Sequence, residues 1–190
     1  MARATARRSA STAHRAQLVR AWEAHVAAEF QQHDVDATMR TMVARPHLLH
    51  LPTLTGGEGA AEVRRFYRRH FIPDLPPDVR IDLISRTVDR ERLVDEFILE
   101  FTHDRVMDFL LPGIAPTGKK VSLPTIAVIG IHSGKIAYEH IYWDQASALV
   151  QVGALAPGRL PIVGAEASRR LQRATRGADR VVVPPASARD

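Results

Sequence analysis

The 190-residue chain contains no cysteine, which excludes disulfide bonds, thiolate nucleophiles and cysteine-ligated zinc or iron–sulfur sites. It also lacks any run approaching the roughly 20 apolar residues that span a bilayer, so we predict no transmembrane segment. No stretch near its start resembles the roughly 7–15-residue apolar core of a secretory signal. These absences favour a cytoplasmic protein. Apolar residues make up 45% and charged residues 25%, as in an ordinary globular domain.

Positive charge is unevenly distributed along the chain, which carries 26 basic and 21 acidic residues. Four arginines and no acidic residue lie in residues 1–15, and seven arginines accompany three acidic residues in 157–190. Residues 16–156 therefore hold 15 basic and 18 acidic residues. Because the excess positive charge lies near the two ends, we expect no specific nucleic-acid partner and no membrane partner. The alternative is weak, salt-sensitive binding of RNA or a membrane surface by the ends.

Composition also divides the chain into three parts. Residues 1–13 are rich in Ala, Arg and Ser, and we predict a disordered basic N-terminal tail there. Residues 14–156 carry regular hydrophobic patterns and form the predicted domain. Residues 157–190 are rich in Arg and Pro, and we predict a C-terminal tail.

The first half of the predicted domain has a helical period. Val19, Trp22, Val26 and Phe30 are spaced three, four and four residues apart, which predicts one face of an amphipathic helix. A second, shorter helix should follow an aspartate N-cap at position 34 or 36. A short strand is predicted over 47–54.

A third helix is expected where two consecutive glycines, Gly56 and Gly57, turn the chain. One side of this helix would carry an apolar and aromatic group of residues, namely Val63, Phe66, Tyr67 and His70. Prolines from position 73 onward should end it.

From residue 79 the period falls to two, which is typical of strands. Segments 79–88 and 93–103 flank a polar turn, and segments 120–132 and 135–143 flank a Ser-Gly turn, as in two antiparallel hairpins. The element order predicts an α+β domain in which helices cover one face of a strongly bent antiparallel sheet.

The last predicted strand concentrates residues able to carry chemistry. Alternation places Tyr138, His140, Tyr142 and Asp144 on one face and Glu139, Ile141 and Trp143 on the other. We favour the first face as the wall of a pocket, because two phenols, an imidazole and a carboxylate suit a polar site. The alternative is that this face meets solvent while the other packs inward.

Three further side chains are candidates for the same pocket. Asp95 and His103 lie at the two ends of an apolar strand face, and His50 comes from the first predicted strand. Each could instead lie at a hydrated edge of the sheet. The loop over residues 108–119 is predicted either to cap the pocket or to contact a second subunit.

Several common site motifs are missing. The glycines near position 57 do not form the strand-G-x-G-x-x-G-helix pattern of nucleotide binding, and no G-x-S-x-G nucleophile elbow occurs. The nine histidines include no H-x-H or H-x-x-x-H pair, so we predict no metal site.

The chain resembles the SnoaL-like polyketide cyclases of the nuclear-transport-factor-2-like superfamily. The resemblance rests on W-D-x6-Q-V-G at 143–153, on TLTGGEGAAEVRRFY at 53–67 and on the order of elements, and covers about 14–156. A closer subset, sharing HFIP, SRTV, FTHD, LPG, PTGK and EHIYWDQAS, resembles proteins labelled carboxymethylenebutenolidase. That label normally belongs to an α/β-hydrolase with a cysteine nucleophile, and this chain has neither that cysteine nor the elbow.

The resemblance implies a cone-shaped curved antiparallel sheet with three helices from the N-terminal half on its concave face. It also implies a homodimer formed through the outer sheet face, and a general acid/base at Asp144 for ring closure. Burial near aromatic side chains would raise the pKa of Asp144 and make it a better base. His140 or Tyr142 would then stabilise the enolate, and no cofactor is needed.

We therefore predict a cofactor-independent enzyme that cyclises, isomerises or hydrolyses a small activated carbonyl compound or lactone. The alternative is a non-catalytic domain that binds a small molecule or forms a dimer. The predicted catalytic residues are Asp144 and His140, and the predicted substrate-binding residues are Tyr142, Trp143, His103, Asp95, His50, Phe66 and Tyr138.

Overall fold

A computed structural model describes residues 2–175 and 181–183 of the chain. Its helical segments are α1 (Ala2–Phe30), α2 (Val35–Arg40), α3 (Gly59–Phe66), η1 (Tyr67–Phe71), η2 (Ile72–Asp74), α4 (Gln145–Val152) and α5 (Glu166–Ala174). The strands are β1 (Met42–His50), β2 (Thr55–Glu58), β3 (Arg80–Val88), β4 (Arg92–Thr102), β5 (Lys120–His132), β6 (Lys135–Trp143) and β7 (Val181–Val183). The predicted α+β class is confirmed. No helix in the described ranges is long and apolar enough to cross a bilayer.

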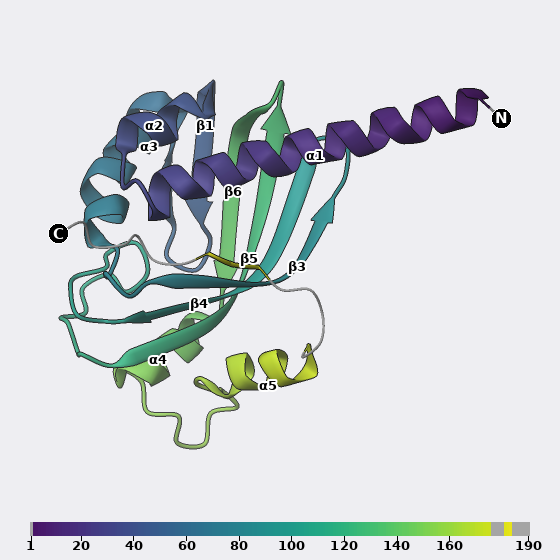
Figure 1. The fold of residues 1–190 in the computed structure, drawn as a ribbon. Coiled ribbons are helices and arrows are strands. Elements are labelled where there is room, and N and C mark those ends of the chain that lie inside the picture. Colours follow the sequence, from purple (N-terminus) through teal and green to yellow (C-terminus); the bar gives the residue numbers. More distant parts are fainter. Residues whose placement is uncertain (1, 176–180, 184–190) are drawn as a thin grey trace.

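The strands form one curved sheet in the order β2-β1-β6-β5-β4-β3-β7. All neighbouring strands are antiparallel except β1 and β6, which are parallel. Helix α1 crosses the concave face of the sheet, with α2 and α3 beside its C-terminal end, as Figure 1 shows. Helices α4 and α5 pack against β5 on the side away from α1. The space between α1 and the sheet is where a site can form.

The local sequence signals explain most element boundaries. The buried face of α1 includes Leu18, Trp22 and Val26, in agreement with the helical period. Asp34 caps α2, since its Oδ1 accepts hydrogen bonds from the backbone N–H groups of Asp36 and Ala37 at 2.8 and 2.9 Å. The open choice between positions 34 and 36 is therefore settled in favour of 34.

The segment with the two glycines is a strand rather than a turn. Residues 55–58 form β2, which pairs antiparallel with β1. Gly56 has a φ of 131°, and a Cβ atom there would lie 2.0 Å from the carbonyl oxygen of Leu48. Only glycine permits this backbone conformation and this close approach, so Gly56 is what allows β2 to pair with β1 here.

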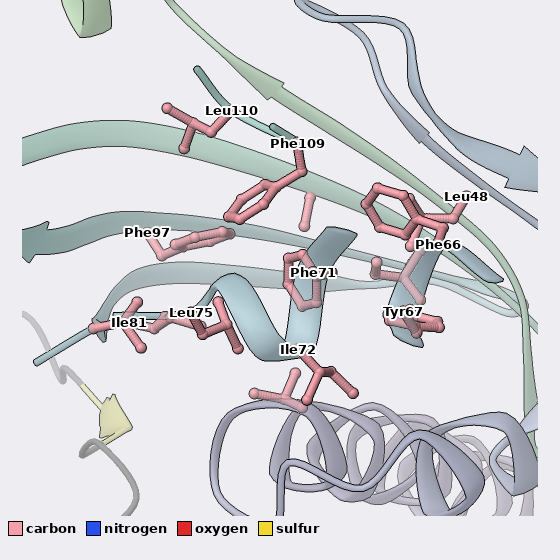
Figure 2. Close-up of a cluster of buried hydrophobic side chains, with 14 of the residues drawn as sticks. Leu48, Phe66, Tyr67, Phe71, Ile72, Leu75, Ile81, Phe97, Phe109 and Leu110 are labelled. Carbon is pink, nitrogen blue, oxygen red and sulfur yellow. The ribbon is translucent and has the colours of Figure 1, made fainter. Parts of the chain in front are cut away.

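The helical segment after β2 changes its register at the π-helix η1. A regular helix would direct His70 inward, but His70 is exposed and Phe71 is buried in its place. A π-helix has an extra residue per turn, which rotates the following side chains relative to an α-helix. Figure 2 shows Phe66, Tyr67 and Phe71 on this segment, with Phe109 nearby. The rings of Phe71 and Phe109 lie 4.9 Å apart between centroids, so the 108–119 loop closes over this aromatic cluster.

Both predicted tails contain regular structure. Helix α1 begins at Ala2, so residues expected to be disordered are helical. Ala and Arg, which dominate this segment, are both strong helix formers. In the C-terminal part, α5 packs on β5, and the hydroxyl of Ser168 donates to the carbonyl of Ser122 at 2.7 Å. Residues 176–180 and 184–190 lie outside the described part of the chain.

Candidate active site

A cavity of about 290 Å³ lies between α1 and the concave face of the sheet. Its walls are mainly aliphatic and aromatic side chains from α1, η1, five strands and the 108–119 loop. The polar and charged residues that line it are Glu23, Glu29, Gln31, His50, Arg86, Asp95, Thr125 and Glu139. A largely apolar cavity with a few polar groups is the usual form of a small-molecule site.

Four buried polar side chains beside this cavity form a connected group, which we call the His25 cluster: His25, Glu29, Tyr67 and Glu139. Nε2 of His25 lies 3.0 Å from Oε1 of Glu139 and 3.2 Å from Oε1 of Glu29. The hydroxyl of Tyr67 donates to the same Glu139 oxygen at 2.7 Å. Glu29 and Glu139 line the cavity, whereas His25 and Tyr67 lie behind them.

The other nitrogen of His25 is held by Thr41. The Thr41 hydroxyl donates to the backbone carbonyl of Thr38 at 2.6 Å, so it accepts from Nδ1–H of His25 across 2.5 Å. Nε2 faces two carboxyl groups and therefore also carries a proton. Burial alone would lower the pKa of His25, but the charges of Glu139 and Glu29 raise it to about 10.

The two carboxyl groups of the cluster have pKa values shifted in opposite directions. Burial raises the pKa of Glu29, and the nearby charge of Glu139 adds to this effect. Burial would also raise the pKa of Glu139, but His25 and the hydrogen bond from Tyr67 lower it below its usual value. Glu139 is therefore the ionised member, and Glu29 is the one that retains a proton more readily.

The two carboxyl groups also differ in how their oxygens are used. Oε1 of Glu29 is buried and lies 3.2 Å from Nε2 of His25 in an ion pair that is not aligned as a hydrogen bond. The hydrogen bonds from His25 and Tyr67 to Glu139 both end on its Oε1. Both residues line the cavity, so the carboxyl group of each can contact a bound molecule.

A second polar group lies further along the concave face. Arg86 donates a bidentate pair of hydrogen bonds to the carboxylate of Asp95, at 2.7 and 2.9 Å, and a third hydrogen bond to Glu23 at 2.9 Å. The indole N–H of Trp22 donates to Asp95 at 2.8 Å. Asp95 is thus held by three donors, and it lines the cavity.

Strand register separates these two polar groups. Asp95, Ala127 and Ile141 lie side by side on β4, β5 and β6, and Glu139 is two residues before Ile141. With strands about 4.8 Å apart and about 3.3 Å per residue, the backbone positions of Asp95 and Glu139 are about 12 Å apart along the sheet. The two carboxylates therefore lie in different parts of the cavity wall.

His50, which we named as a candidate for the pocket, lies in the cavity wall. It is buried among the rings of Phe66, Phe71, Phe109 and Trp143, with centroid distances of 5.4 to 6.0 Å. Burial lowers its pKa to about 4, against a smaller opposing effect of Glu139, so the imidazole is neutral at pH 7. Phe66 is buried beside His50 and supports it from behind rather than lining the cavity.

The face of the last strand that we predicted to form the pocket wall points away from the cavity. Glu139, Ile141 and Trp143 line the cavity, whereas the neighbouring residues on β6 point to the outer face of the sheet. Asp144 is exposed, and its Oδ1 accepts the backbone N–H of Ser147 at 3.2 Å as the N-cap of α4. The predicted burial of Asp144 is therefore incorrect, because the chain leaves the strand at this residue to begin a helix.

The remaining residues of that outer face form a half-buried cluster of their own. The rings of His47, Tyr138 and His140 stack at centroid distances of 4.8 to 5.2 Å, and Nε2 atoms of the two histidines lie 3.0 Å apart. Tyr142 is 42% exposed on the same side. None of these four side chains lines the cavity, so His140, Tyr138 and Tyr142 are separated by the sheet from Glu139.

His103 is buried but lies outside the cavity. It directly follows β4, its Nδ1 is 3.2 Å from the hydroxyl of Thr117 in the 108–119 loop, and its Nε2 has no hydrogen-bond partner among the described residues. Of the predicted site residues, Trp143, Asp95 and His50 line the cavity.

Sequence reasoning missed the His25 cluster. Positions 22, 25, 26 and 29 share one face of α1, as the helical spacing of three and four residues requires. Two ionisable residues at His25 and Glu29 on an otherwise apolar face were a usable signal. The third member, Glu139, is 114 residues away, and no local pattern connects it to α1.

A family model described as a SnoaL-like domain matches residues 13–139. The structure is similar to a candidate SnoaL-like polyketide cyclase from Jannaschia sp. CCS1, with 16% identity, a TM-score of 0.58 and coverage of 75% of this chain and 96% of that chain. It is similar to TsrD from Streptomyces laurentii, with 19% identity, a TM-score of 0.59 and coverage of 74% and 98%. TerC, co-crystallised with polyporic acid, has 15% identity, a TM-score of 0.55 and coverage of 72% and 98%. No curated protein matches the sequence.

Proposed function

The chain belongs to the SnoaL-like domain family, and from this premise and the cavity we propose an enzyme that uses buried carboxyl groups as general acid and base. Its substrate would be a small activated carbonyl compound or lactone, and the reaction an isomerisation or ring closure. The observation that carries the proposal is the pair Glu29 and Glu139, adjacent in the cavity wall and shifted in opposite directions in pKa. Such a pair assigns one acid and one base.

Glu139 is the proposed base. Its ionised form is maintained by His25 and Tyr67, which both contact Oε1, so Oε2 can accept a proton from carbon. The electron pair of the broken C–H bond moves into the adjacent carbonyl to form an enolate. This step is feasible when the carbon is already activated, since positioned acid–base groups supply about 10²–10⁴-fold in rate.

Glu29 is the proposed acid. Its protonated form would donate a hydrogen bond to the carbonyl oxygen on which negative charge develops. In an isomerisation, the proton on Glu139 returns to a different carbon. In a ring closure, the enolate carbon attacks a second carbonyl of the same molecule, the new alkoxide takes the proton of Glu29, and the proton on Glu139 restores Glu29. Each route leaves both residues as they began and needs no cofactor.

The cavity lining supports a neutral, largely apolar substrate. Four acidic residues line it against the single arginine, Arg86, which is already paired with Asp95 and Glu23. An anionic substrate would meet net negative charge in a poorly hydrated space, which costs free energy. The polar groups near Asp95 would bind a second oxygen or nitrogen of the substrate.

The test uses 2-tetralone, a neutral bicyclic ketone with an activated carbon. Deuterium exchange at that carbon is followed by NMR with and without protein. We expect catalysed exchange that falls by about 10²-fold or more in Glu139→Gln and by a smaller factor in Glu29→Gln, within the range of acid–base catalysis. Asp144→Asn is the control and should retain the rate of the unchanged protein.

Equal exchange rates for Glu139→Gln and the unchanged protein would contradict the assignment of the base. Binding of 2-tetralone without any catalysed exchange would favour the alternative, a domain that binds small molecules but does not turn them over. A homodimer formed through the outer sheet face also stays a prediction, and the mass of the protein in solution at micromolar concentration tests it.

A further inference from the structure

The His25 cluster has a property that acid–base catalysis does not use. Nε2 of His25 and one carboxylate oxygen each from Glu29 and Glu139 all lie within 4.8 Å of one another. One nitrogen and two carboxylate oxygens are ligands that first-row transition metals accept. We propose that these three atoms bind one divalent ion such as Zn²⁺, Mn²⁺ or Co²⁺.

The spacing of the ligand atoms fits a single ion. Two bonds of about 2.1 Å at a right angle place their ligand atoms about 3.0 Å apart. Nε2 of His25 is 3.0 Å from Oε1 of Glu139 and 3.2 Å from Oε1 of Glu29. These two distances are compatible with one ion that contacts all three residues.

The hydrogen bond on the far side of the His25 ring is of the kind that metal-binding histidines make. Such a residue usually donates its second N–H to a protein acceptor, which fixes the orientation of the ring. His25 donates from Nδ1 to the Thr41 hydroxyl, which is itself held by the backbone carbonyl of Thr38. Tyr67 holds the Glu139 carboxylate in the same way.

Glu29 supplies the third ligand from a buried position. It is 2% exposed, and its Oε1 lies 3.2 Å from Nε2 of His25 in an ion pair that is not aligned as a hydrogen bond. A buried carboxylate oxygen needs a donor or a cation close to it. A bound ion would replace this poorly aligned contact.

The ion would also reach the cavity, because Glu29 and Glu139 line it. Three protein ligands leave coordination positions for water or for an oxygen of a bound molecule. Ion binding and the proposed acid–base chemistry use the same protons and exclude each other. A bound ion would therefore switch off the proposed acid–base chemistry. Because ion binding is measured without substrate, its test does not depend on the proposed reaction.

The experiment titrates the metal-free protein with Co²⁺ and follows visible absorption, with calorimetry in two buffers of different ionisation enthalpy. We expect one ion per chain, release of protons on binding and an affinity that rises with pH, because the ion competes with protons for its ligands. Zn²⁺ should displace Co²⁺. In Glu29→Gln, affinity should fall by more than the roughly 10–100-fold typical for loss of a group that supports a ligand.

The matched control is His47→Ala, which removes one of the two imidazoles that meet at 3.0 Å on the outer face. This variant should bind Co²⁺ like the unchanged protein. Binding that is lost in His47→Ala but kept in Glu29→Gln would assign the ion to the outer face and overturn the proposal. Absence of Co²⁺ bands in a folded protein would overturn it as well, whatever the result of the 2-tetralone assay.

Discussion

The two faces of β6 carry polar residues of similar kinds in opposite environments. On the concave face Glu139 is 3% exposed and contacts His25 and Tyr67 across the cavity wall. On the outer face Tyr138 and His140, its immediate neighbours, stack on His47 and remain half-buried. Whether a residue joins an acid–base network depends here on which face α1 covers.

Burial also changes what each cluster can do. On the concave face, desolvation and close charges move the pKa of His25 to about 10 and that of His50 to about 4. On the outer face, burial and the neighbouring His47 lower the pKa of His140. Charges interact more strongly away from water, so the pKa values of the groups on the concave face are shifted further apart than those on the outer face.

The largest effect should come from breaking the inner cluster. Glu139→Ala leaves His25 and Tyr67 buried without their acceptor, and loss of one partner of a buried ion pair costs about 3–5 kcal/mol. Urea unfolding of this variant measures the loss. His140→Ala, one residue further along β6 and on the outer face, is the control and should cost clearly less. Equal losses for both variants would contradict the contrast between the faces.

A smaller effect should appear on raising the pH. The folded protein keeps the His25 proton up to about pH 10, whereas the unfolded chain releases it near pH 6.5. Stability from this group is complete below pH 6.5 and is lost as pH rises toward 10. The loss of this contribution should lower the free energy of unfolding by about 1.4 kcal/mol per pH unit between pH 7.5 and 9, and a proton held by Glu29 would add to the slope with the same sign.

This slope is measured by urea unfolding in the presence of EDTA, so that no ion occupies the cluster. The variant His25→Gln has no imidazole to titrate and should show a slope that is smaller by about this amount, while Asp144→Asn should keep the full slope. A stability that rises over this pH interval in the unchanged protein would contradict the assigned state of His25.

The smallest effect is expected for Asp144→Ala. This change removes the N-cap of α4 and should cost about 1 kcal/mol in thermal or urea unfolding. The exchange of 2-tetralone should be unaffected, because the side chain is exposed and outside the cavity. A loss of exchange without a loss of stability would restore Asp144 to the site.

Residue patterns predicted much of the fold but little of the site. The four long strands, the two hairpins and the apolar face of α1 follow from periods of two and 3.6 residues. The same alternation divided β6 into its two faces correctly. It could not tell which face turns inward, since both carry polar and apolar residues, and the polar face proved to be the outer one.

The sequence by itself determined the α+β class, the two faces of β6 and the alignment of His25 and Glu29 on one side of α1. Only the tertiary structure decided that Glu139 faces this pair, that the π-helix η1 directs Phe71 inward in place of His70, and that Asp144 caps a helix. The physical reason is the distance along the chain over which each interaction acts. Periodicity and capping act over a few residues, whereas the environment of a buried charge depends on segments more than a hundred residues apart in the chain.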